Sequence, residues 1–148
     1  MEPADDGGWH KLQVLCLHGS RQSAGVFAKR LKTLERKCKA VADLHFIDAP
    51  HSVAEAEDES VSRCWWLPGL AKGEVHPDWP AQWSTSEQVL RAELEAASQR
   101  GRPYHGILGF SNGAACAAML VSDSRGEAAP LRFAIFAGQQ FDPFSSAG

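Results

Sequence analysis

The stretch Gly109-Phe110-Ser111-Asn112-Gly113 has the residue types and spacing for nucleophilic catalysis, in the pattern Gly-x-Ser-x-Gly. The apolar Ile107 and Leu108 precede it, and an alanine-rich run over 114–120 follows. A strand, a tight glycine-flanked turn and a helix would hold a serine hydroxyl at the carboxyl edge of a sheet, with the helix N-terminus facing the attacked atom. Ser111 is therefore the predicted catalytic nucleophile, acting through an acyl-serine intermediate.

A serine nucleophile also needs hydrogen-bond donors for the oxyanion that forms during the reaction. One predicted donor is the backbone N–H of Asn112, at the start of the helix. The second should come from the loop after the first strand, which reads His18-Gly19-Ser20-Arg21. We expect the N–H of Ser20 to serve, with Arg21 as the second choice.

A base and its orienting acid are harder to assign. In enzymes built on this turn they follow the nucleophile, but all six histidines of the chain precede Ser111. Asp142 is a weak candidate for the acid; Asp123 and Glu127 also follow the serine. His51 and His76 lie in a loop from which they could reach Ser111, although surface loop histidines are commoner. His105 should lie at the opposite end of the elbow strand.

The surrounding elements predict an α/β fold with a parallel sheet flanked by helices. The first strand is apolar on both faces, as expected for a buried strand of such a sheet. Residues 84–87 read as a capping box that opens a helix with Leu90, Leu94 and Ala97 on one face and a Glu87–Arg91 pair. The expected order is strand 11–17, helix 27–38, strand 41–47, irregular 51–83, helix from 84 to Gly101, elbow strand and helix, strand 133–137.

The irregular segment over residues 51–83 contains four of the five tryptophans, broken by prolines. It is expected to be a loop over the carboxyl edge of the sheet. Its tryptophans would either line an apolar acyl or aryl pocket or simply pack the loop onto the sheet.

Composition narrows the function classes. The chain has 148 residues and a net charge of −3, which disfavours nucleic acid as the main partner. Its one basic cluster reads as a solvated helix face. No signal peptide, membrane span, metal-binding spacing or cofactor motif is apparent, and the four cysteines look like reduced, mostly buried thiols. We expect a cytoplasmic or nuclear protein with no cofactor, a small-molecule ester as substrate and an undetermined oligomeric state.

Five stretches in order along the chain resemble the FSH family of serine hydrolases, esterases of the α/β-hydrolase fold. The matching stretches are Val14–Ser23, Asp48–His51, Arg63–Trp66, Tyr104–Ala114 and Arg132–Gly138. The family usually has Gln at position 112 and Asp at position 105. Its members continue for two more strands that deliver the catalytic Asp and His.

The resemblance therefore implies an incomplete α/β-hydrolase fold that lacks the C-terminal strands. Residues 1–10 would be a disordered lead-in and residues 11–148 a C-terminally truncated hydrolase domain. The expected activity is hydrolysis of carboxylic esters, with thioesters as the alternative substrate class, and it is expected to be impaired in this chain. The alternative is a non-catalytic binding module of the same descent. In space the strands should run second, first, elbow, last, with the last strand an open edge.

Overall fold

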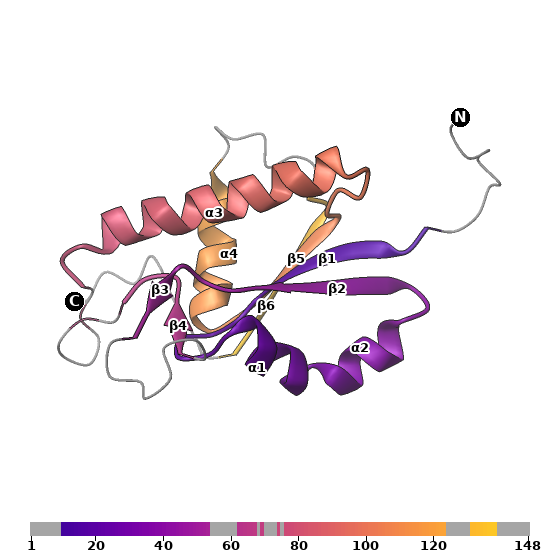
Figure 1. Cartoon of the computed structure of the whole chain (residues 1–148), viewed down its shortest axis with the longest axis horizontal. Helices are drawn as coiled ribbons and strands as arrows, with labels where there is room; N and C mark the ends of the chain where they lie inside the picture. Colours follow the sequence, from indigo (N-terminus) through magenta and orange to yellow (C-terminus); the bar gives the residue numbers. More distant parts are fainter. Residues whose placement is uncertain are drawn as a thin grey trace.

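The computed structural model describes residues 10–53, 62–67, 69, 74, 76–123 and 131–138 (Figure 1). Four parallel strands form the main sheet in the order β2-β1-β5-β6, and β3 and β4 form a small antiparallel pair beside it. In chain order the elements are β1 (Leu12–Leu17), α1 (Ala24–Arg30), α2 (Lys32–Cys38), β2 (Ala42–Ile47), β3 (His51–Ser52), β4 (Arg63–Cys64), α3 (Trp79–Gln99), β5 (Gly106–Phe110), α4 (Asn112–Ser122) and β6 (Phe133–Ala137).

The sheet is covered on both faces, with α1 and α2 on one side and α3 and α4 on the other (Figure 1). Because successive side chains of β1 point to opposite faces of the sheet, they belong to two separate hydrophobic clusters. Val14 and Cys16 join the cluster around Phe27 of α1, whereas Leu15 and Leu17 join the cluster under α3 and α4. The prediction of a first strand buried on both faces is confirmed.

The predicted strand order and parallel pairing are both confirmed. β1 lies in register with β2 on one side and β5 on the other, and β6 pairs with β5. Among the described strands, β2 and β6 are therefore the edges. Two large side chains of β6 are well exposed, Ile135 at 47% and Phe136 at 52%.

The single helix predicted over residues 27–38 is wrong in detail, because the chain forms two short helices joined at Leu31. Leu31 has φ −95° and ψ 8°, outside the helical region, although its N–H still donates to the carbonyl of Phe27. After this break the apolar side chains of the predicted helix no longer reach the core, and Leu34 is 40% exposed. The spacing alone could not show that α2 lies beside β2 without burying any of its residues.

The capping box predicted at residues 84–87 is also wrong, because α3 begins five residues earlier, at Trp79. Pro80 lies in the first turn, where a helix needs no N–H donor, so the proline starts the helix rather than preventing it. Ser86 is fully buried inside α3 and its hydroxyl donates to the carbonyl of Trp65 at 2.6 Å.

Other predictions for α3 are confirmed. Leu90 and Ala97 are fully buried and Leu94 packs against them. The Glu87–Arg91 pair forms at 3.1 Å, and Gly101 follows the helix with φ +76°. None of the helices in the described part of the chain is both long and apolar enough to cross a membrane. Residues 1–9 of the expected disordered lead-in, Glu127 and Asp142 lie outside the described residues.

Candidate active site

Ser111 lies between the end of β5 and the start of α4, in a backbone conformation that is rare for a serine. Its φ is 53° and its ψ −114°, so it is one of only two non-glycine residues with positive φ in the described part of the chain. Its N–H donates to the carbonyl of Ala137 at the end of β6, which holds the turn in place. Such strain persists only where surrounding structure imposes it, and it clusters at functional sites. The predicted strained strand-turn-helix is confirmed.

Both glycines that flank the serine are required by close backbone approach. A Cβ on Gly113 would overlap the carbonyl oxygens of Leu17 and His18, at the end of β1. A Cβ on Gly109 would overlap the carbonyl of Gly113. The first turn of α4 therefore packs directly onto the carboxyl end of β1, which explains the Gly-x-Ser-x-Gly spacing sterically.

The loop after β1 lies beside this turn. Leu17 and Gly109 are register partners, so the residues that follow each of them emerge at the same carboxyl edge. Gly19 approaches Phe110 closely, and a Cβ on Gly19 would lie 2.9 Å from the Phe110 ring. The sequence prediction that Ser111 and the Gly19-Ser20 loop share one edge is confirmed.

Hydrogen bonds within this loop occupy two of its three central N–H groups. The N–H of Gly19 donates to Oε1 of Gln22 at 2.9 Å, and the N–H of Arg21 donates to the carbonyl of Arg63 at 2.9 Å. Arg21 adopts φ 63° to do so, which is unusual for an arginine. The N–H of Arg21 is thus directed into the protein, and Ser20 between them is exposed.

Asn112 connects the start of α4 to the loop after β4. Its side-chain Oδ1 accepts a hydrogen bond from the N–H of Trp65 at 2.9 Å. The indole Nε1 of Trp65 donates to the carbonyl of His18 at 2.9 Å. The backbone carbonyl of Trp65 accepts a hydrogen bond from the hydroxyl of Ser86. Through Trp65, therefore, the turn at the nucleophile, the loop after β1 and α3 are held together.

His18 is fully buried beneath the loop, and both ring nitrogens have partners. Nδ1 lies 2.8 Å from the carbonyl of Gly19, and Nε2 lies 3.0 Å from the N–H of Ala49. A carbonyl can only accept and an N–H can only donate, so Nδ1 carries the proton and the ring is neutral. Burial lowers the pKa of His18, against weaker opposing effects of the Gly19 carbonyl and Asp48. His18 positions the loop and has no free nitrogen for proton transfer.

Three other histidines, His51, His76 and His105, are also engaged in hydrogen bonds. His51 donates through Nε2 to the carbonyl of Gln82 at 3.0 Å, and Nδ1 of His76 accepts from the N–H of Asp78. His105 lies at the amino end of β5, as predicted, where Nδ1 accepts from the N–H of Gln13. Asp123 follows the far end of α4 and pairs with Arg91 at 3.2 Å.

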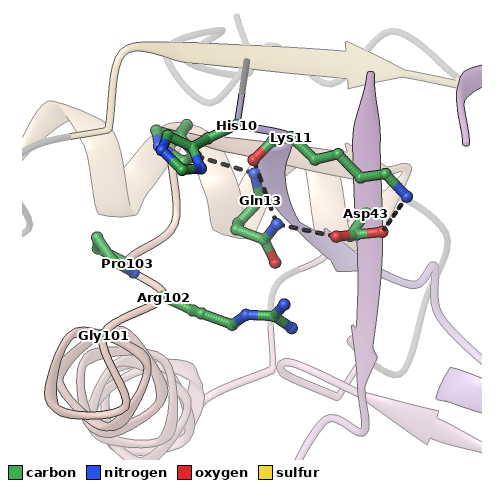
Figure 2. A pocket seen from close by; sticks show the side chains of 8 residues that line it. His10, Lys11, Gln13, Asp43, Gly101, Arg102 and Pro103 are labelled. Carbon is green, nitrogen blue, oxygen red and sulfur yellow. Dashed lines mark hydrogen bonds and ion pairs between the residues drawn. The ribbon is translucent and has the colours of Figure 1, made fainter. Parts of the chain in front are cut away.

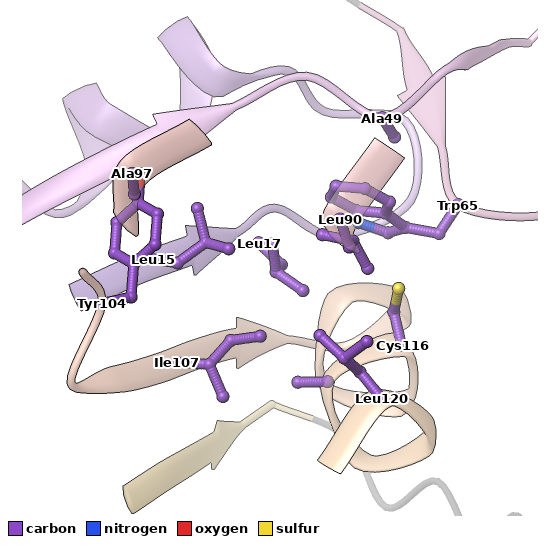
Figure 3. Close-up of a cluster of buried hydrophobic side chains, with 11 residues drawn as sticks. Leu15, Leu17, Ala49, Trp65, Leu90, Ala97, Tyr104, Ile107, Cys116 and Leu120 are labelled. Atoms are coloured by element: carbon purple, nitrogen blue, oxygen red, sulfur yellow. The ribbon is translucent and has the colours of Figure 1, made fainter. Parts of the chain in front are cut away.

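The tryptophans divide between loop and helix, which corrects the prediction of one irregular segment. Trp65 is fully buried in the cluster that contains Leu17 and Leu90 (Figure 3). Trp83 belongs to α3 and packs edge-to-face against Trp66, with ring centroids 6.0 Å apart. For Trp65 the packing interpretation is therefore correct.

Sequence reasoning assigned no role to Arg63, Gln22 or the side chain of Asn112. Arg63 donates through Nη1 to the carbonyl of Ala49 at 3.1 Å, while its buried Nε has no hydrogen-bond partner within the described residues. Its backbone pairs with Gln22 in an isolated bridge. Only the stretch Arg63-Cys64-Trp65-Trp66, noted for its resemblance, pointed to this segment.

Comparison with known proteins agrees with this geometry. The family described as "Serine hydrolase (FSH1)" matches residues 8–145. Esterase C25G4.2 of Caenorhabditis elegans is 32% identical over 85% of this chain and 58% of its own length. Esterase OVCA2 of Danio rerio is 30% identical over 84% and 63%, and Esterase CG5412 of Drosophila melanogaster 32% identical over 86% and 47%. The chain thus spans about half to three fifths of these relatives, and it belongs to the FSH1 family of serine hydrolases.

Proposed function

We propose that this chain carries the nucleophile and the oxyanion-binding groups of an esterase that acts on carboxylic esters, with thioesters as a possible second substrate class. Ser111 would attack the carbonyl carbon of the ester and form an acyl-serine, releasing the alcohol or thiol. The observation that carries the proposal is the positive φ of Ser111 at the start of α4, typical of a nucleophile elbow.

The proposed oxyanion donors are the backbone N–H groups of Ser20 and Asn112. The hydrogen-bond pattern of the loop supports Ser20 over its neighbours, because the N–H groups of Gly19 and Arg21 already donate to Gln22 and Arg63. Asn112 begins α4, where the N–H groups of the first turn have no helical partner. Its side chain is engaged with Trp65, so only its backbone would face the oxyanion.

The base would have to come from a group other than His18, whose two nitrogens are both occupied. Without a base, an oxyanion site still provides on the order of 10³–10⁴-fold acceleration over water in serine hydrolases. We therefore expect residues 1–148 to hydrolyse a simple aryl ester slowly. His51 and His76, which are engaged with Gln82 and Asp78, are the residues to substitute if turnover is fast.

The decisive experiment is labelling of residues 1–148 with a fluorophosphonate, followed by peptide mapping, beside Ser111→Ala. We expect slow labelling confined to Ser111, together with ester turnover that is lost in Ser111→Ala. Ser84→Ala, in α3, is the matched control and should label like the wild type. Absence of labelling at Ser111, or equal labelling of several serines, would support the alternative of a non-catalytic binding module.

A further inference from the structure

The outer edge of β2 combines open backbone hydrogen-bonding groups with a concentration of positive charge. In the part of the chain that the structure describes, β2 pairs only with β1. Its six residues contain neither proline nor glycine, and all six are in continuous register with β1. An unprotected edge of this kind is a template for another strand.

The direction of the free groups follows from the parallel ladder. The N–H of Leu12 donates to the carbonyl of Val41 at 2.9 Å, so the carbonyl of Val41 faces β1. Successive residues of a strand direct these groups to alternate sides. The N–H and C=O groups of Ala42, Leu44 and Phe46 therefore point away from β1, toward the open edge.

A groove of about 910 Å³ follows this edge. Ala42 and Leu44, which pack toward the α1 side, line it together with Asp43 and His45, which lie on the opposite face of the strand. Because residues from both faces of β2 line the groove, the groove runs along the edge of this strand. In Figure 1 this edge lies open between α2 and α3.

The groove is strongly cationic although the chain carries a net charge of −3. Two carboxylates, Glu35 and Asp43, line it against six cationic side chains: Lys11, Lys29, Lys32, Arg36, Lys39 and Arg102. Four of the six come from the α1–α2 side. Asp43 is already paired with Lys11 at 3.6 Å and accepts from Nε2 of Gln13 at 3.0 Å.

The hollow continues around the amino end of the sheet. Lys11, Asp43 and Arg102 also line a second cavity of about 450 Å³, with His105 and Gln13. Figure 2 shows the Arg102 side chain directed toward Gln13 and Asp43. No hydrogen bond or ion pair occupies the Arg102 guanidinium within the described residues. An anionic ligand along β2 would therefore meet cations at both ends of the groove.

We propose that the β2 edge binds an extended acidic peptide segment of a partner protein, which adds to the sheet as a fifth strand. Backbone hydrogen bonds to Ala42, Leu44 and Phe46 would supply the pairing, as in other cases of strand addition. Side chains of the added strand alternate between the faces of the sheet. Every second residue would thus face the α1–α2 cations, so the ligand has acidic residues at alternate positions. The inference is independent of the chemistry at Ser111, because Ser111 follows β5, which β1 separates from β2.

The test uses a fluorescent peptide of about eight residues with alternating Glu and Val, a length that covers a typical strand. We expect saturable binding to residues 1–148 by fluorescence anisotropy, and at least tenfold weaker binding when Lys replaces Glu. The variant Lys32→Glu/Arg36→Glu should also bind at least tenfold more weakly. Ser111→Ala should bind like the wild type.

Backbone methylation separates strand addition from simple charge attraction. Two versions of the peptide carry N-methyl groups, one on the odd and one on the even residues. Because an edge strand bonds only through alternate residues, one version should lose binding and the other keep it. If both versions bind as well as the parent peptide, or if a polyphosphate of equal charge competes while methylation has no effect, strand addition is wrong.

A matched pair of protein variants makes the same distinction. Leu44→Pro removes one outward-facing N–H and no ladder bond to β1, and proline is tolerated at such edge positions. Leu44→Ala loses the same side-chain packing but keeps the N–H. We expect Leu44→Pro to weaken binding at least fivefold relative to Leu44→Ala, with circular dichroism confirming that both are folded. Equal affinity of the two would contradict the proposal.

Discussion

The side-chain oxygen of Asn112 accepts a hydrogen bond from the backbone N–H of Trp65 at 2.9 Å, across 47 positions of the sequence. This bond ties the first residue of the helix after the nucleophile to the loop after β4. The backbone of Asn112 and its side chain therefore have separate tasks: the N–H is the proposed oxyanion donor, and the amide oxygen holds the neighbouring loop. The two tasks can be tested separately.

Asn112→Ala should lower the free energy of unfolding by about 1–2 kcal/mol, because it leaves the N–H of Trp65 without an acceptor. Asn112→Asp is the control, since it keeps an acceptor and places a negative charge at a helix N-terminus, where it is favourable. Urea unfolding at pH 7 should rank Asn112→Asp near the wild type. Equal loss in both variants would mean that the bond to Trp65 contributes little.

Acidification should destabilise the protein through His18. The pKa of this residue is lowered by burial in the folded chain, while the unfolded chain takes up a proton near pH 6.5. The unfolded state then holds more protons, so stability is fully present above pH 6.5 and decreases as pH falls below it. The slope from one such residue is at most about 1.4 kcal/mol per pH unit. Urea unfolding between pH 5 and 8 measures it.

A second histidine, His45, also makes stability fall at low pH, so its effect must be separated from that of His18. Burial also lowers the pKa of His45, whose Nε2 donates to Oε1 of Gln13 at 2.7 Å. The pH dependence should persist in His45→Gln, and the ring resonances of His18 should titrate below pH 6.5 in NMR spectra. Titration of His18 at or above 6.5 would show that the buried neutral ring is not maintained.

Gly113→Ala should destabilise the chain by about 2–3 kcal/mol, because its Cβ would overlap backbone carbonyls of Leu17 and His18 that cannot move independently. Gly25→Ala in α1 is the matched control. Its Cβ would meet only Oγ of Ser23, at 3.9 Å, so alanine should stabilise the helix by about 0.5–1 kcal/mol. Thermal unfolding should therefore move in opposite directions for the two variants.

Of the four free cysteines, only Cys38 should react readily with a thiol reagent in the native protein. Burial raises the pKa of Cys16 to about 12 and that of Cys64 to about 11, and it raises the pKa of Cys116 well above its ordinary value. Reaction requires the thiolate and access to it. Thiol titration at pH 8 should detect one fast-reacting thiol in the folded protein and four in urea. More than one fast native thiol would show that the core opens.

Local sequence determined the four strands of the main sheet and the turn at Ser111, but not the short strands β3 and β4. The nearly continuous apolar run at Leu12–Leu17 is typical of a strand buried on both faces, and β1 has that position. The glycines two residues before and after Ser111 predict a tight turn. In the structure, a Cβ on either Gly109 or Gly113 would overlap backbone atoms. These features depend on periodicity and on steric rules within a few residues.

Only the tertiary structure decided how the site is supported. Helical spacing and the capping pattern did not reveal the break at Leu31, nor the start of α3 at Trp79, where Pro80 lies in the first turn. The occupied N–H of Arg21, the neutral tautomer of His18 and the acceptor role of Asn112 each require a partner 31 to 47 positions away. Hydrogen bonds between such distant residues leave no local pattern in the sequence, because they form only when the folded sheet brings their loops to one edge.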